Sequence, residues 1–174
     1  YYAYRCVVSN EFSEVITDEV TLELLFNPYF YDIKGYDTTI REGEDALFET
    51  KIMGGNPLVA TGVYWEVNKG NGFVRLSDVE ELKGLCAEES ITETIDGVTY
   101  HTRTALKITK APLSMNGYIF RCVMTYGDYR TDMQFHLKVL TECQQNGHDW
   151  SEATCTTLST CSKCGETRGE LLPH

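Results

Sequence analysis

"YIFRCVMTY", residues 118–126, has a second version near the start of the chain, "YAYRCVVSN", residues 2–10. The cysteines of the two copies, at positions 122 and 6, are 116 residues apart (122 minus 6). Each copy continues into a further strand-like segment, "VTLEL" at 20–24 and "FHLKV" at 135–139. A period close to the length of one β-sandwich domain predicts tandem domains, the first of them truncated to its last strands.

The segments between the two copies alternate as strands do. In "ALFETKI", residues 46–52, and "VYWEV", residues 63–67, every second residue falls on the same face. Turn signals separate the segments: "MGGNPL" at 53–58, "NKGNG" at 68–72, and "IDGV" at 95–98, whose Asp-Gly pair suits a type I′ hairpin. About eight short strands with turns between them, and no clear helix, predict an all-β sandwich.

These segments are similar to an immunoglobulin-like domain of the kind repeated in bacterial surface proteins. The resemblance covers about residues 27–140. It is carried by "REGEDALFETKI" (41–52) as a B strand, "GVYWEV" (62–67) as a C strand with a buried Trp65, "TALKITKA" (104–111) as an E strand, and "MNGYIFRC" (115–122) as the corner leading into the F strand.

Two positions depart from that pattern. Thr50 stands where the B strand would carry the partner cysteine, so the resemblance implies that no inter-sheet disulfide forms. Cys122 is then expected to be a buried free thiol against Trp65. Phe120 replaces the corner tyrosine, which leaves Tyr118 as the residue that could make the corner hydrogen bond.

The predicted organisation therefore has three parts. Residues 1–26 are the C-terminal strands of a truncated immunoglobulin-like domain, which form a partial sandwich hairpin. Residues 27–140 are an immunoglobulin-like β-sandwich. Residues 141–174 are a Cys/His-rich repeat module, because four of the seven cysteines fall there.

Charge and composition exclude several classes of function. Apolar residues make up 42% of the chain, which predicts a packed core, and no apolar run is long enough to span a bilayer. A net charge of -11 argues against binding to nucleic acid or to anionic membranes. His101 and His136 are expected to be ordinary strand residues, and "DVEEL" at 78–82 a solvated acidic loop. No catalytic residue and no enzyme activity are predicted.

The tail beyond residue 140 is too short to hold a shape by apolar burial alone, so a metal or disulfides are needed. Cys161 and Cys164 have the two-residue gap of a zinc knuckle, and Gly165 permits its tight turn. Structural zinc is the predicted cofactor, with Trp150 covering the site. The predicted ligands are His148, Cys155, Cys161 and Cys164.

Alternative ligand sets use Cys143 in place of Cys155 or His174 in place of His148, and disulfides or a free thiol cluster are a further possibility. The tail also resembles short repeats, approximately "GHxWxxATCxxxxxCxxCGxxxGxxxxH", at the ends of surface proteins in Gram-positive bacteria. The fixed positions of that pattern are present here, from Gly147 to Gly169, with His174 where the next repeat would begin.

The leading hypothesis is a non-catalytic spacer or adhesion segment of a bacterial cell-surface or secreted protein, hence an extracellular location. Its expected partners are a host or cell-wall glycan or protein. The alternative is a carbohydrate- or peptide-binding module accessory to an enzyme elsewhere in the parent chain, with the aromatic stretch "NPYFYDIKGY", residues 27–36, as part of its surface. The same stretch could instead seal a joint between domains.

Overall fold

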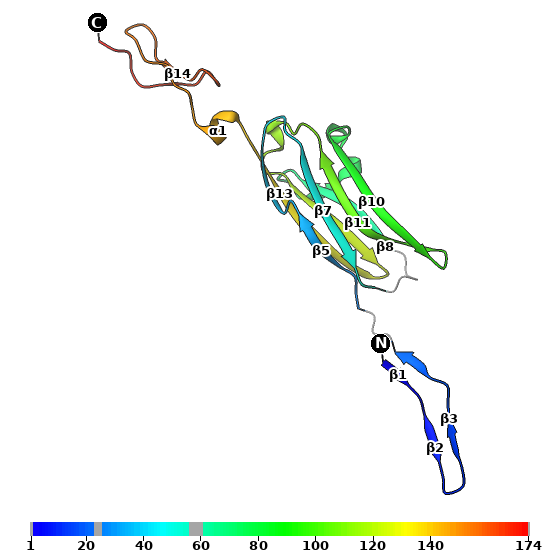
Figure 1. The fold of residues 1–174 in the computed structure, drawn as a ribbon. Helices are drawn as coiled ribbons and strands as arrows, with labels where there is room; N and C mark the ends of the chain where they lie inside the picture. The colour runs from blue at the N-terminus through cyan, green and yellow to red at the C-terminus, as the bar shows by residue number, and fades with distance from the viewer. Residues whose placement is uncertain (1, 23–25, 56–60, 174) are drawn as a thin grey trace.

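The computed structural model describes residues 2–22, 26–55 and 61–173. Figure 1 shows an N-terminal hairpin, a two-sheet body and a small C-terminal module that follow one another along the chain. The helices in these residues are too short and too polar to cross a bilayer.

The central body consists of two packed sheets, which confirms the predicted all-β sandwich. In the described part of this body the first sheet has the order β10, β11, β7, β5 and the second β6, β13, β12, β8, β9. Relabelled by the immunoglobulin convention, these orders are D, E, B, A and A′, G, F, C, C′, the order of that sandwich. The strands are β5 (Tyr29–Lys34), β6 (Asp37–Arg41), β7 (Ala46–Met53), β8 (Thr61–Asn68), β9 (Phe73–Arg75), β10 (Cys86–Ile95), β11 (Val98–Ile108), β12 (Ile119–Tyr126) and β13 (Tyr129–Leu140).

One strand pair of the second sheet is parallel. β6 and β13 run side by side in the same direction, from the pair Asp37 and His136 to the pair Arg41 and Leu140. All other strand pairs of the two sheets are antiparallel. β6 and β13 therefore join the beginning and the end of the sandwich directly.

Short turns and helical turns connect the strands. Asp96 (φ 49°) and Gly97 (φ 82°) join β10 to β11 with positive φ at both positions, which agrees with the predicted type I′ hairpin. Three single 3₁₀ turns lie at η1 (Leu76–Asp78), η2 (Glu80–Leu82) and η3 (Leu113–Met115). Of the predicted turn at 53–58, residues 56–58 lie outside the described part of the chain.

An aromatic cluster fills the core between the sheets. The ring of Phe48 lies 5.3 Å from Phe135 and 5.5 Å from Phe120, and Trp65 lies 5.2 Å from Phe135, measured between centroids. All four rings are buried, at separations typical of attractive aromatic pairs. Cys122 is fully buried and stands beside Trp65 in the register of β8 and β12.

The cysteine at the centre of the core is a free thiol, as predicted. Thr50, where a disulfide partner would stand, is fully buried, and its hydroxyl donates to the carbonyl oxygen of Tyr31 at 3.1 Å. Burial raises the pKa of the Cys122 thiol, so this thiol stays protonated and packs as a small apolar group.

Glu49 is a buried acid on the opposite side of β7 from this core. Its carboxylate accepts hydrogen bonds from Arg103, and from Lys34 at 2.7 Å. These bonds, that of Arg103 first, lower the pKa of Glu49 from 4.5 to about 2. The pair of cations therefore ties β5 and β11 to the strand between them.

The N-terminal hairpin repeats the strand register of the sandwich. In β2 (Val7–Ser9) and β3 (Glu14–Ile16), Val7 pairs with Ile16, Val8 with Val15 and Ser9 with Glu14. Adding 116 to each number gives the pairs 123 with 132, 124 with 131 and 125 with 130, which are the pairs that join β12 to β13. The two copies of the sequence motif therefore share their pairing as well as their residues.

The outer strands of the hairpin are shifted by one residue. In β1 (Tyr2–Tyr4) and β4 (Val20–Leu22), Tyr4 pairs with Val20. The matching pair in the sandwich is Phe120 with Phe135, at offsets of 116 and 115 (120 minus 4, 135 minus 20). The hairpin thus has one extra residue in its second half.

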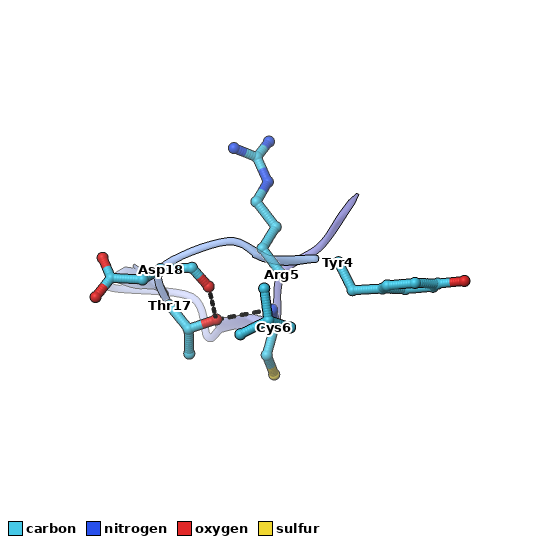
Figure 2. Close-up of a pocket in the computed structure, with 6 residues that line it drawn as sticks. Tyr4, Arg5, Cys6, Thr17 and Asp18 are labelled. Carbon is cyan, nitrogen blue, oxygen red and sulfur yellow. Dashed lines mark hydrogen bonds between the residues drawn. The ribbon is translucent and has the colours of Figure 1, made fainter. Parts of the chain in front are cut away.

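The apolar side chains of the hairpin are exposed although their counterparts are buried. Tyr4 is 52% exposed and Val20 65%, whereas Phe120 and Phe135 are completely buried. Figure 2 shows an open hollow near Cys6, where the Thr17 hydroxyl accepts from the Cys6 amide at 2.9 Å and donates to the carbonyl oxygen of residue 18. The hairpin has the residues of a sandwich face without a second sheet over them.

Candidate metal centre

A short helix follows the last strand of the sandwich directly. α1 (Glu142–Asn146) begins with a capping box, in which the Thr141 hydroxyl accepts from the Gln144 amide at 3.2 Å and the Gln144 side chain accepts from the Thr141 amide at 2.9 Å. It ends at Gly147, whose φ of 78° is favourable for glycine. This turn holds the buried side chain of Cys143 close to the end of β13.

A tight knuckle supplies two further sulfurs. The Gly165 amide donates to the carbonyl oxygen of Cys161 at 2.9 Å, and Gly165 has the positive φ (75°) that the turn requires. On either side of the knuckle, β14 (Ser159–Thr160) pairs with β15 (Thr167–Arg168). The local fold therefore brings Cys161 and Cys164 to one side, as their spacing predicted.

Four side chains converge on one point. The ligand atoms of Cys143, His148, Cys161 and Cys164 all lie within 4.8 Å of one another. The Sγ atoms of Cys143 and Cys161 are 3.7 Å apart, and Cys164 Sγ lies 3.4 Å from His148 Nδ1. In a tetrahedral zinc site the bond lengths put two sulfurs at about 3.8 Å and a sulfur and a nitrogen at about 3.6 Å. These four residues can therefore hold a metal ion.

The imidazole of His148 is held in position by its neighbours. Its Nε2 atom lies 3.3 Å from a carboxylate oxygen of Glu166, so Nδ1 is the nitrogen directed at the sulfurs. The Trp150 ring stacks on the imidazole, with centroids 4.7 Å apart and planes 21° apart. The Arg168 guanidinium lies over the Trp150 ring, 4.3 Å from its centroid. Trp150 thus covers one face of the His148 ring.

The sulfurs differ in their tendency to lose a proton. Burial alone would raise the pKa of Cys161, but hydrogen bonds from the backbone amides of Cys164 and Lys163 and from His148 outweigh it and lower the pKa to about 6. Burial raises the pKa of Cys143 to about 12, with hydrogen bonds to Cys164 and Cys161 adding to the effect. Of these two sulfurs Cys161 is therefore the more readily deprotonated, and thiolate is the form that binds metals.

Cys155 is not part of this group, and the structure has Cys143 in its place. The chain folds back on itself between Ser151 and Thr160, whose backbone atoms bond at 2.9 Å, and Cys155 lies on the turn between Thr154 and Thr157 at the other end of that loop. The loop carries its cysteine away from the knuckle, so the predicted set with Cys155 is corrected to the alternative with Cys143. His174, the other alternative ligand, lies outside the described residues.

The tail has little apolar material of its own to bury. Between residues 141 and 173, Cys143 and Cys161 are the buried side chains. A segment of this size cannot fold on two cysteines alone. The four converging ligand atoms are therefore the feature that can hold it together.

The remaining candidate residues lie in the sandwich, apart from this group. His101 belongs to β11, and burial lowers its pKa. His136 belongs to β13, where its Nδ1 lies 2.8 Å from the Asp37 carboxylate. Both are strand residues, as predicted.

The aromatic stretch 27–36 does not form one continuous surface. Tyr29 lies between Phe26 and Tyr31 at 5.9 and 6.3 Å, with the rings tilted by 32° and 57°. Tyr36 instead packs edge-on against His136 of the second sheet, at 5.8 Å. Phe26, Tyr29 and Tyr31 form one small group, in which the first two are exposed and Tyr31 is half-buried, and Tyr36 packs elsewhere.

No protein-family model matches the chain, and no curated protein sequence matches it. Among solved structures it aligns with a chimeric titin Z1Z2 carrying a peptide from decorin (21% identity, TM-score 0.45, 69% of this chain and 100% of that one). It also aligns with a titin M10 and obscurin-like 1 Ig complex (18%, TM-score 0.44, 66% and 94%) and with murine CRIg (13%, TM-score 0.46, 67% and 100%). The strand order of the chain itself makes residues 29–140 an immunoglobulin-like β-sandwich.

Proposed function

We propose that the chain is a non-catalytic spacer or adhesion segment of a bacterial cell-surface or secreted protein, built from immunoglobulin-like modules in series and ending in a zinc-stapled repeat. The observation that carries this proposal is the shared register of the N-terminal hairpin and the β12–β13 hairpin. Modules repeated along a chain lengthen it without adding chemistry, which is what a spacer requires.

In this proposal residues 1–26 are the last two strands of a preceding sandwich. The exposed Tyr4, Val8 and Val20 correspond to core residues of the second module, and a second sheet would bury them. Cys6 corresponds to Cys122, which is fully buried. A hairpin alone is at best marginally stable in water, so a covering sheet would also stabilise the strands.

The reactivity of Cys6 tests the tandem arrangement. The natural protein, extended on the N-terminal side by about 100 residues, one module length, is compared with residues 1–174 in thiol labelling under native conditions. We expect Cys6 to be labelled rapidly in the shorter chain and to be protected in the longer one, as Cys122 is in both. Equal labelling of Cys6 in both chains, read by peptide mass spectrometry, overturns the arrangement.

We assign zinc to the metal centre. Three thiolates and one imidazole are a soft donor set, for which zinc is the common structural ion. Protein purified under reducing conditions should contain about one equivalent of zinc by elemental analysis. Less than about half an equivalent, with the thiols of the tail oxidised in pairs, would favour disulfides instead.

The extracellular location and the partners belong to the same proposal. A host or cell-wall glycan or protein suits a surface segment, and the charge of -11 disfavours nucleic acid. Surface biotinylation of intact bacteria that produce the parent protein should label it. Recovery of the unlabelled protein in the cytoplasmic fraction contradicts the location.

The aromatic group at Phe26, Tyr29 and Tyr31, in which Tyr31 is half-buried, is the feature behind a second candidate, a carbohydrate- or peptide-binding module. Sugars bind to flat aromatic faces, whereas these rings are tilted and Lys51 lies over Tyr31 at 5.9 Å. Saturable binding on a glycan array that is lost in Tyr31→Ala would favour this candidate. Signal at background level would remove it.

A further inference from the structure

The metal centre takes its ligands from both sides of Gly147, the residue that separates α1 from the rest of the tail, residues 148–173. Cys143 belongs to α1, immediately after β13, while His148, Cys161 and Cys164 belong to the chain beyond Gly147. A ligand set with Cys155 in place of Cys143 would have lain wholly beyond Gly147. Cys143, which replaces Cys155 in the ligand set, is therefore the ligand that connects the metal centre to α1 and β13.

α1 follows β13 directly in the chain and is bonded to the sandwich through a side-chain hydrogen bond, from Arg41 to Gln145. Thr141 follows the last residue of β13 and starts the helix with the capping box. The Arg41 Nε atom, at the end of β6, donates to Gln145 Oε1 at 2.5 Å. The amide of residue 42 donates to the carbonyl oxygen of Leu140 at 2.9 Å, which keeps β6 and β13 together at this point. α1, the helix that contains Cys143, thus follows the end of the sandwich at β13 (Figure 1).

Apart from the metal ligands, few contacts in the described chain cross this junction. An ion pair joins Lys163 to Glu142 at 3.4 Å, with the two side chains 33% and 56% exposed. Exposed pairs of this kind hold geometry weakly. Gly147, with φ 78° and no atom near the place of a Cβ, is the point at which the backbone can pivot.

We propose that the metal centre is the joint of the molecule: the bound ion fixes the tail in one direction relative to the sandwich, and its loss turns the tail into a free tether pivoting at Gly147. The proposal rests on the metal centre of the proposed function. It assigns the ion a second effect, which a ligand set within the tail could not have, because rigidity passes from β13 through α1 and Cys143 to the knuckle.

The experiment is ¹⁵N relaxation of the full chain, with zinc content measured on each sample. In the zinc-loaded protein, we expect the amides of residues 148–172 to share the rotational correlation time of the sandwich. After chelation their order parameters should fall below about 0.6 while the sandwich stays near 0.85. Cys155→Ser is the matched control and should retain both zinc and the shared correlation time.

Two variants separate the joint from the binding of metal. Insertion of Gly-Gly between Leu140 and Thr141 leaves every ligand and the capping box in place; zinc content should be unchanged, but the tail should tumble faster than the sandwich. Cys143→Ser, zinc-loaded through the other three ligands, should uncouple the tail beyond Gly147 as well.

The outcomes distinguish failure of the joint from failure of the metal centre. Zinc-loaded wild-type protein whose tail tumbles independently, or a zinc-loaded Cys143→Ser protein with one shared correlation time, overturns the joint and leaves the metal centre standing. A wild-type protein that takes up no zinc overturns the metal centre of the proposed function, and with it the joint.

Discussion

Glu49 illustrates how one residue can depart from the strand pattern and still serve the fold. Alternation places it opposite Phe48, on the side where a polar residue meets water, yet it is 5% exposed. Its burial is compensated by Arg103 and Lys34, which come from the strands on either side. The pattern of residues 46–52 does not predict these partners, because they come from distant parts of the chain.

Substitution of Glu49 by Gln should destabilise the sandwich by about 1–3 kcal/mol, because a buried acceptor of two charged hydrogen bonds loses its charge. The folded pKa of about 2 lies below the free value of 4.5, so this contribution is complete above pH 4.5 and disappears as the pH falls towards 2. Chemical denaturation at pH 7 and at pH 3 measures both effects.

The control for this prediction is Glu81→Gln, which removes the charge of an exposed ion pair with Lys69. Its effect should stay within about 0.5 kcal/mol. A Glu49→Gln protein as stable at pH 7 as the wild type would show that the ion pairs of Glu49 with Arg103 and Lys34 do not stabilise the sandwich.

The metal ligands show what spacing can and cannot predict. Cys161 and Cys164 are two residues apart, so local geometry alone brings their sulfurs together. The choice between Cys143 and Cys155 depends on how the loop between Ser151 and Thr160 folds back, which spacing does not reveal. The signal for Cys143 was the sequence from Thr141 to Gln144, a capping box that predicts a helical turn around the cysteine.

We therefore expect Cys161→Ser and Cys155→Ser to behave differently. Cys161→Ser removes a ligand sulfur and should lower zinc affinity by at least about tenfold. Cys155→Ser should leave affinity within about twofold, because its sulfur is outside the group. Competition with a chromophoric chelator measures both, and a loss of affinity in Cys155→Ser alone would restore the ligand set predicted from the sequence.

At the scale of elements, the strands of the sandwich followed from their pattern and the small elements did not. β7 and β8 alternate apolar and polar residues, so burial of one face fixes their type and orientation. α1 has five residues, fewer than two turns, so it carries no apolar periodicity to detect. Its existence depends on the cap and on the junction it occupies.

Removal of the metal should unfold the tail and spare the sandwich. The tail has no apolar core of its own, whereas the sandwich closes over the Phe48, Trp65 and Phe135 cluster. With chelator, hydrogen exchange should become fast at residues 148–173 and remain slow in β7, β8 and β12. Loss of protection in the central strands as well would show that the two parts fold as one cooperative unit.

At the scale of the whole molecule, the similarity of residues 2–10 to residues 118–126 was visible in the sequence. The matching register of β2 with β3 and of β12 with β13 extends this similarity to the strand pairing. The pattern of residues 2–22 determines how these strands pair, but it does not determine what packs over their exposed face, so a covering sheet belongs to the proposal.

Deletion of residues 1–22, which keeps Phe26 and its contacts with Tyr29 and Gly55, should leave the unfolding free energy of the sandwich unchanged within about 0.5 kcal/mol. The described residues of the hairpin are all exposed, so they bury nothing against the sandwich. Thermal and chemical denaturation of residues 23–174 beside the full chain measures this, and a drop of more than about 1 kcal/mol would show that the hairpin supports its neighbour.

The parallel pairing of β6 with β13 has a mechanical consequence. These strands lie at the beginning and end of the sandwich and run in the same direction, from Asp37 beside His136 to Arg41 beside Leu140. A pull on the two ends of the module slides one strand along the other, so that the hydrogen bonds between them are loaded in shear and must break together. An antiparallel pair pulled from one end would open one bond at a time, and the module should therefore resist stretching more than its thermal stability alone suggests.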